Sequence, residues 1–166
     1  MQARRATYGP ALAGLCAALI LLLTLLSIPL PLGYMNLGDV GVFLAACLLM
    51  SGRIDLPIRR GALYAGLAAA AGGALADVLL GFAAYAPATF VIKGLMGLGC
   101  AWLLRLFPGK QRIFAMLAVA PLVPLGYLCF EYFLYGPTAM LNVWANALQV
   151  LVGAGLAYVS AIALKV

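Results

Sequence analysis

Histidine is absent from this 166-residue chain, and acidic residues are scarce. Asp and Glu together number four, and charged residues make up 8% of the sequence. Without histidine there is no base for a Ser–His or Cys–His nucleophile, and the commonest metal ligand is missing. A carboxylate mechanism built on Asp39, Asp77 or Glu131 is the catalytic plan that remains. The chain also lacks a GxxxxGKS/T phosphate loop, which excludes ATP hydrolysis by that route.

The cysteines are equally uninformative as reactive groups. There are four of them, far apart in apolar segments and without a CxxC pair: Cys16, Cys47, Cys100 and Cys129. Thiols in such surroundings are typically buried packing groups. We therefore expect no metal site, no disulfide and no cofactor.

Apolar residues dominate what is present. They make up 67% of the sequence, and the mean hydropathy is +1.14. Because a membrane-spanning helix needs about 20 apolar residues, the length allows about six helices and leaves no room for a soluble domain. We predict an all-α integral membrane protein, one domain over residues 1–166. Its six transmembrane helices are expected at about 8–30, 39–50, 61–82, 89–107, 113–135 and 138–164, the second being short and the fifth kinked by Pro121 and Pro124.

Basic residues are distributed unevenly between the two sides of this topology. One side receives Arg4, Arg5, Arg53, Arg59, Arg60, Arg105, Lys110, Arg112 and Lys165, and the opposite loops receive none. The positive-inside rule then predicts that both termini are cytoplasmic. Topology thus explains the net charge of +6, so that we expect a lipid bilayer and no nucleic acid as its partner.

Polar residues inside the predicted spans mark a candidate site. Asp77 and Lys93 flank the turn between the third and fourth helices, and an ionisable residue at membrane depth usually faces a protein interior. Asp39 and Glu131 lie in the same outer half. The simpler alternative is that Asp77 and Lys93 form a buried ion pair that ties two helices together.

The last predicted helix adds a polar face. Asn142, Asn146 and Gln149 follow one another at spacings of four and three, which places them on one side of a helix. Aromatic residues lie at similar depth, among them Tyr34 and Tyr85. Together these groups predict an outward-opening pocket for a small, polar, ring-containing solute. The alternatives are that the amides join helices to one another and that the aromatic rings form an interfacial belt.

Small residues follow one face of the first predicted helix. Ala13 and Ala17, and next to them Gly14 and Ala18, are spaced four apart. Such a strip lets another helix approach closely, either from a partner protein or from this chain itself.

Three motifs resemble those of a known family. They are Asn36-Leu37-Gly38-Asp39, Ala76-Asp77, and Tyr85-Ala86-Pro87-Ala88-Thr89-Phe90 followed by Ile92-Lys93-Gly94-Leu95-Met96-Gly97. With these motifs the chain resembles the substrate-binding S components of energy-coupling factor (ECF) vitamin transporters, in the branch named after riboflavin. The resemblance implies that the loops after the first and fifth helices, with the turn between the third and fourth, cover the binding site. In this chain the turn between the fifth and sixth helices is very short, which departs from that pattern.

The resemblance implies a six-helix subunit of a prokaryotic cell membrane that captures a small water-soluble vitamin and catalyses no reaction. It also implies that Ala13 and Ala17 contact a transmembrane coupling (T) subunit, which is driven by two cytoplasmic ATPases. Pyridoxine-, hydroxymethylpyrimidine- and riboflavin-like ligands fit about equally well. The expected ligand contacts are Asn36, Asp39, Asp77, Tyr85, Lys93, Glu131, Asn142 and Asn146. Two other readings stay open, a structural protein that docks partner helices and an intramembrane aspartyl enzyme.

Overall fold

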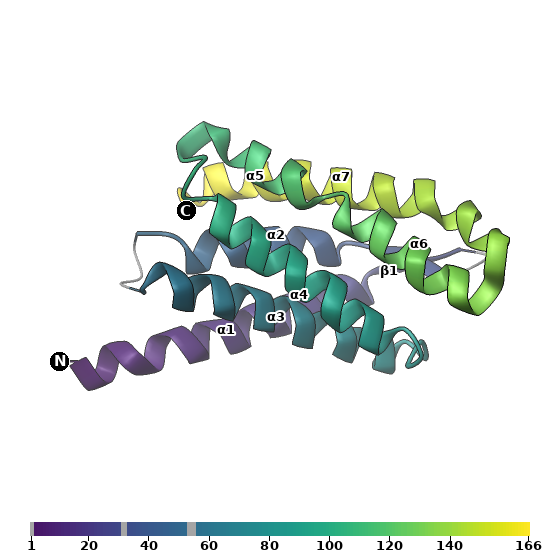
Figure 1. Ribbon diagram of the computed structural model, residues 1–166. Helices are drawn as coiled ribbons and strands as arrows, with labels where there is room; N and C mark the ends of the chain where they lie inside the picture. Colours follow the sequence, from purple (N-terminus) through teal and green to yellow (C-terminus); the bar gives the residue numbers. More distant parts are fainter. Residues whose placement is uncertain (1, 31–32, 53–55) are drawn as a thin grey trace.

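The computed structural model describes residues 2–30, 33–52 and 56–166 as a bundle of helices with a small hairpin at one end (Figure 1). The elements in chain order are α1 (Gln2–Leu25), β1 (Ser27–Leu30), β2 (Gly33–Asn36), α2 (Gly38–Leu49), α3 (Ile58–Leu79), α4 (Ala86–Leu103), η1 (Gly109–Gln111), α5 (Arg112–Val119), α6 (Leu122–Tyr135), η2 (Gly136–Ala139) and α7 (Met140–Ala163).

The first helix ends earlier than the sequence predicted. We expected it to continue to Leu30, but α1 ends at Leu25 and the chain enters the antiparallel β1–β2 hairpin, in which Pro29 pairs with Tyr34. A proline ring clashes with the carbonyl group four residues before it, and for Pro29 that residue is Leu25. Gly33–Asn36 falls between the first two predicted helices, and it forms a strand that is held in a fixed register with β1.

The short helix α2 lies at the centre of the bundle. Every one of its residues except Leu48 is buried, and Phe43 and Val42 have no exposed surface. It packs against α1, α3, α4 and α7. At about 1.5 Å per residue it is about 18 Å long, which is less than the ~30 Å of a bilayer core. Its surroundings are protein rather than lipid, so that it need not match that thickness.

Glycines allow the neighbouring helices to approach closely. A Cβ atom built on Gly97 of α4 would lie 2.7 Å from the carbonyl oxygen of Ala65 in α3, and one on Gly72 of α3 would lie 2.5 Å from that of Ala17 in α1. Both distances are too short for any side chain. The Gly- and Ala-rich helix α3 thus packs closely against both of its neighbours, α1 and α4.

The predicted fifth helix is divided in two. α5 ends at Val119 and α6 begins at Leu122, with Pro121 at the break. Pro124 lies in the first turn of α6, where its missing N–H would have no partner in the helix anyway. The predicted interruption is confirmed, and it lies at Pro121.

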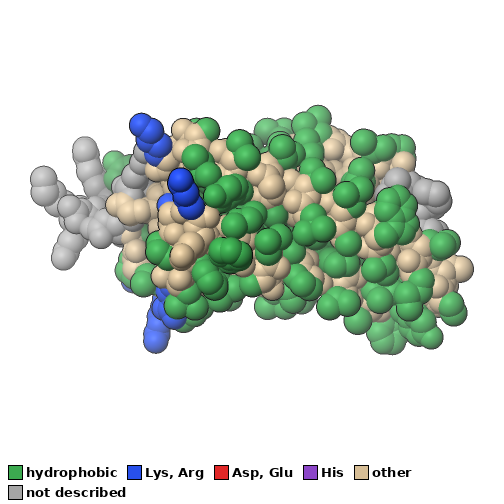
Figure 2. All heavy atoms as spheres, turned by 90° about the horizontal axis from the view of Figure 1, so that it is seen from above, with side chains coloured by type: hydrophobic (Ala, Val, Ile, Leu, Met, Phe, Trp, Pro, Cys, Tyr) green, Lys and Arg blue, Asp and Glu red, His purple; other side chains and the backbone are tan. Residues whose placement is uncertain are grey.

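Charge and hydrophobicity divide the molecule along its length. Basic side chains gather at the end that carries the chain termini, and hydrophobic side chains cover the flank between the ends (Figure 2). Four described stretches are long and apolar enough to cross a membrane: Tyr8–Leu25, Ile58–Leu79, Ala86–Leu103 and Gly109–Ala163, the last containing α5, α6 and α7.

Candidate binding pocket

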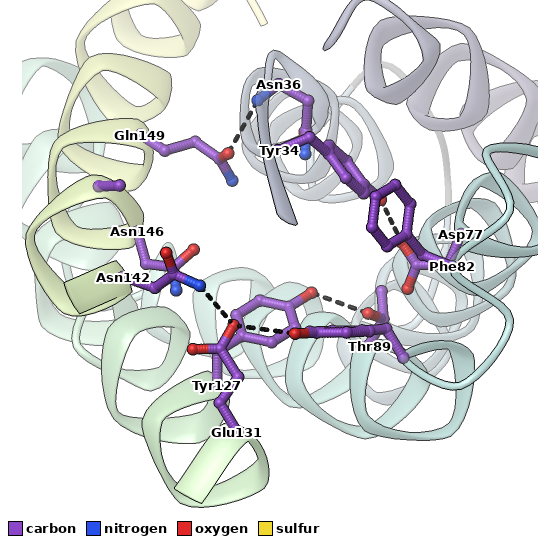
Figure 3. A pocket seen from close by; sticks show the side chains of 12 residues that line it. Tyr34, Asn36, Asp77, Phe82, Thr89, Tyr127, Glu131, Asn142, Asn146 and Gln149 are labelled. Atoms are coloured by element: carbon purple, nitrogen blue, oxygen red, sulfur yellow. Dashed lines mark hydrogen bonds between the residues drawn. The ribbon is translucent and has the colours of Figure 1, made fainter. Parts of the chain in front are cut away.

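A polar pocket opens at the end of the bundle opposite the basic residues, and Figure 3 shows the side chains that line it. Its cavity has a volume of about 40 Å³, and the unfilled space including its open mouth is about 480 Å³. A ring-sized ligand therefore requires some side chains to move. The lining residues come from β2, α3, α4, α6, α7 and the α3–α4 turn: Tyr34, Asn36, Asp77, Phe82, Tyr85, Thr89, Tyr127, Glu131, Asn142, Ala145, Asn146 and Gln149.

The hairpin supplies one wall and is fastened to two helices. Tyr34 donates a hydrogen bond from its hydroxyl group to Asp77 Oδ1, and its ring lies 4.9 Å from that of Phe82 between centroids. Burial, and then the adjacent Asp77 carboxylate, raises the pKa of Tyr34 above its usual range, so that the phenol stays protonated and donates. The backbone N–H of Asn36 donates to Gln149 Oε1 at 2.8 Å, which attaches the hairpin to α7.

Asn36 also positions the start of α2. Its Oδ1 atom accepts a hydrogen bond from the N–H of Gly38 at 2.7 Å, an Asx turn in which the side chain satisfies a backbone group two residues on. One residue thus ends the hairpin, begins the central helix and lines the pocket.

The opposite wall is organised around Glu131. Its Oε1 atom accepts hydrogen bonds from Asn142 Nδ2 at 3.2 Å and, at 3.4 Å, from the hydroxyl group of Tyr85. Nearby, the hydroxyl groups of Thr89 and Tyr127 lie 2.8 Å apart and share a hydrogen bond. This network joins α4, α6 and α7 at the depth of the pocket.

Lys93 forms a buried ion pair, but not with Asp77, the partner named in the alternative interpretation. Lys93 Nζ pairs with Asp39 Oδ1 and not with Asp77. Gln149 Nε2 donates to the other Asp39 oxygen at 2.8 Å, so that α2, α4 and α7 meet at this carboxylate. The Lys93 stem passes Gly73 of α3, where an added Cβ would lie 3.4 Å from its Cγ. The pair lies beside the pocket, with Nζ 5.8 Å from the centroid of the Tyr127 ring, and lines none of it.

Two carboxylate oxygens at the pocket have no hydrogen-bond partner among the described residues. They are Asp77 Oδ2 and Glu131 Oε2, on side chains of residues that are each 3% exposed. An acceptor that is buried without a donor is costly, which makes both atoms natural points of attachment for a ligand.

The structure brings together six of the eight residues that the sequence singled out as ligand contacts. Asn36, Asp77, Tyr85, Glu131, Asn142 and Asn146 line the pocket, whereas Asp39 and Lys93 are occupied by each other. Six lining residues were not predicted as contacts: Tyr34, Phe82, Thr89, Tyr127, Ala145 and Gln149. Depth pointed to Tyr34 and Gln149, and a motif contained Thr89. Tyr127 carried no signal of its own, because it lies within an apolar run.

The small residues of α1 serve at least partly within the chain. Ala17 is half-buried, and α3 approaches its carbonyl oxygen at Gly72. Ala13 is half-buried too, whereas Gly14 and Ala18 are exposed.

Comparison with known proteins decides the family. The family described as ECF-type riboflavin transporter, S component, matches residues 6–165. The chain belongs to this family. A similar relative is a Pyrococcus woesei protein named "Uncharacterized protein in gap 3'region", which is 33% identical over 143 residues, or 81% of this chain and 88% of the relative.

Membership settles the broad role of the chain. An S component is the substrate-binding subunit of a vitamin transporter and not an enzyme, which excludes the aspartyl-enzyme reading. The apolar helices, together with the family, make it a multi-pass membrane protein.

Proposed function

We propose that this S component captures a small water-soluble vitamin or precursor from outside a prokaryotic cell, in the pocket between the hairpin, α3, α4, α6 and α7. Six segments span the membrane in this proposal: α1, α2, α3, α4, α5 with α6, and α7. Both termini are cytoplasmic, since the basic end then lies inside and the pocket opens outward. A transmembrane coupling subunit and two cytoplasmic ATPases supply the energy for uptake.

The observation that carries the proposal is the composition of the pocket. Carboxylate, amide and phenol groups from α3, α4, α6, α7 and the hairpin converge on one space that is walled by aromatic rings. Convergent polar groups in an aromatic-lined cleft are typical of small-molecule sites. Pyridoxine, hydroxymethylpyrimidine and riboflavin are all flat heterocycles with hydrogen-bonding substituents, and they form the candidate ligand class.

The first test is native mass spectrometry of the purified protein in detergent, followed by thermal-shift titration with these three compounds. A bound vitamin should raise the melting temperature, because binding only to the folded state stabilises it. A stable, empty protein that responds to none of them would favour a structural protein that docks partner helices.

Asn146 offers a direct check of the pocket. It is half-buried on the lining face of α7. Asn146→Ala should weaken vitamin binding by about 1 to 3 kcal/mol while the protein stays folded, if the amide is a buried partner of the ligand. Leu151→Ala is the matched control, because Leu151 is on the same helix and 52% exposed. Equal affinities of the two variants would remove Asn146 from the site.

A further inference from the structure

The charges around the pocket are unbalanced. Among the described residues near it there are three carboxylates, Asp39, Asp77 and Glu131, and one ammonium group, Lys93. Asp39 already pairs with Lys93. The other described basic residues lie at the far end of the molecule. The pocket therefore offers an anionic ligand no free cation within the described part of the chain, and two carboxylates face any occupant.

In each of these two carboxylates only one of the two oxygen atoms accepts a hydrogen bond from the described residues. Asp77 accepts from Tyr34 through Oδ1, and Glu131 accepts from Asn142 and Tyr85 through Oε1. The second oxygen of each has no donor. The two side chains stand on different walls, Asp77 beside Phe82 and Glu131 next to α7 (Figure 3). One occupant placed between them could donate to both.

Aromatic rings define the shape of the space between the carboxylates. Phe82 lies against Tyr34, and Tyr85 lies 6.4 Å from Tyr127 between ring centroids. Walls of this kind favour a flat ring through stacking and edge contacts.

We propose that the open oxygens of Asp77 and Glu131 select the charge of the ligand, so that the pocket takes a neutral or cationic flat heterocycle with N–H or O–H donors on two edges and rejects its phosphorylated form. A phosphate dianion would stand close to two carboxylates in surroundings of low dielectric, where repulsion between like charges is strong. This inference rests on the proposed function of the same pocket.

The test uses pairs of ligands that differ only by a phosphate: pyridoxine and pyridoxine 5′-phosphate, hydroxymethylpyrimidine and its phosphate, and riboflavin and flavin mononucleotide. Affinities are measured by calorimetry on the full chain in detergent. We expect at least one free compound to bind and its phosphate to bind at least 100-fold more weakly.

Two variants probe the carboxylates themselves. Asp77→Asn and Glu131→Gln keep the shape of each side chain and remove its charge. Each should weaken the free compound at least tenfold and narrow the discrimination against its phosphate. The melting temperature without ligand should stay the same or rise, because a buried charge with an incomplete set of donors has been removed. Lys110→Gln, which removes a charge at the opposite end, should change neither affinity nor discrimination.

The possible outcomes distinguish a failure of the charge selection from a failure of the proposed vitamin-binding function. Equal binding of a free compound and its phosphate, or unchanged affinity in both carboxamide variants, overturns the charge selection and leaves the vitamin-binding role intact. If neither member of any pair binds to the folded protein, both ideas are overturned for this ligand class.

Discussion

At the scale of single residues, the ion pair between Asp39 and Lys93 is the most consequential contact. Asp39 is fully buried and Lys93 is 5% exposed. Replacing Lys93 with Met leaves the Asp39 charge buried without its partner, which typically costs about 3 to 5 kcal/mol. We expect a marked fall in the melting temperature of the purified protein. The control variant is Lys110→Met, at an exposed lysine, and it should change the melting temperature little.

The double variant Asp39→Asn, Lys93→Met removes both charges and identifies the cause. It should recover most of the lost stability, because no unpaired charge remains. A double variant that is as unstable as Lys93→Met alone would contradict the pairing.

The sequence predicted where the buried charged residues lie, but not which of them pair. The depth of Asp39, Asp77, Lys93 and Glu131 follows from helix length alone. The structure places Asp77 and Glu131 in the pocket wall and the Asp39–Lys93 pair beside it, as depth suggested. The pairing does not follow from depth. Lys93 is nearer in sequence to Asp77, but it meets Asp39 because α2 is enclosed by the other helices, and no periodicity in the sequence reveals that arrangement.

At the scale of helices, close packing at glycine can be tested with one matched pair. Gly97→Ala puts a methyl group 2.7 Å from the backbone oxygen of Ala65, and such overpacking should destabilise by about 1 to 3 kcal/mol. Gly14→Ala adds the same methyl group where nothing lies within 4 Å, and it should stabilise α1 by about 0.5 to 1 kcal/mol. Chemical denaturation of both variants measures the difference. Similar effects would show that α3 and α4 are free to separate.

The hairpin depends on Gln149 for its attachment to α7. Gln149→Leu removes the bond from the Asn36 N–H and the bond to Asp39. Because two hydrogen bonds of about 1 kcal/mol or more are lost, amide exchange in β1 and β2 should become at least tenfold faster, as read by hydrogen–deuterium exchange mass spectrometry. Gln111→Leu, at the exposed basic end, should leave the hairpin amides unchanged. Unchanged exchange in the Gln149 variant would mean that Tyr34 alone holds the hairpin.

Sequence patterns predicted the helices better than the segments that connect them. Apolar runs located the long helices, and Pro121 marked a real break. The hairpin was missed because Ser27–Leu30 is as apolar as the helix before it, so that hydropathy cannot separate them. Pro29 held the relevant information, since its ring forbids the helical carbonyl contact four residues earlier.

At the scale of the whole molecule, the orientation can be tested in cells. In a Cys129→Ala background, which removes the one exposed thiol of the described chain, Ala84→Cys lies in the α3–α4 turn beside the pocket and Lys110→Cys lies at the basic end. A maleimide that does not cross membranes should label the first in intact cells and the second only after permeabilisation. The reverse pattern would place the pocket inside.

The gathering of basic side chains at one end also limits how the molecule can turn within a bilayer. Arg59, Arg60, Arg105, Lys110 and Lys165 are all exposed there. Even on the lenient insertion scale each costs about 2.5 to 3.5 kcal/mol at the membrane centre, so that carrying them together through hydrocarbon would require on the order of 10 kcal/mol. This cost holds the basic end at the surface of the membrane. The subunit can tilt while this end stays in water, but it is not expected to invert in the bilayer by itself. In the orientation we propose, a movement that carries the basic end through the hydrocarbon would have to be driven by another protein.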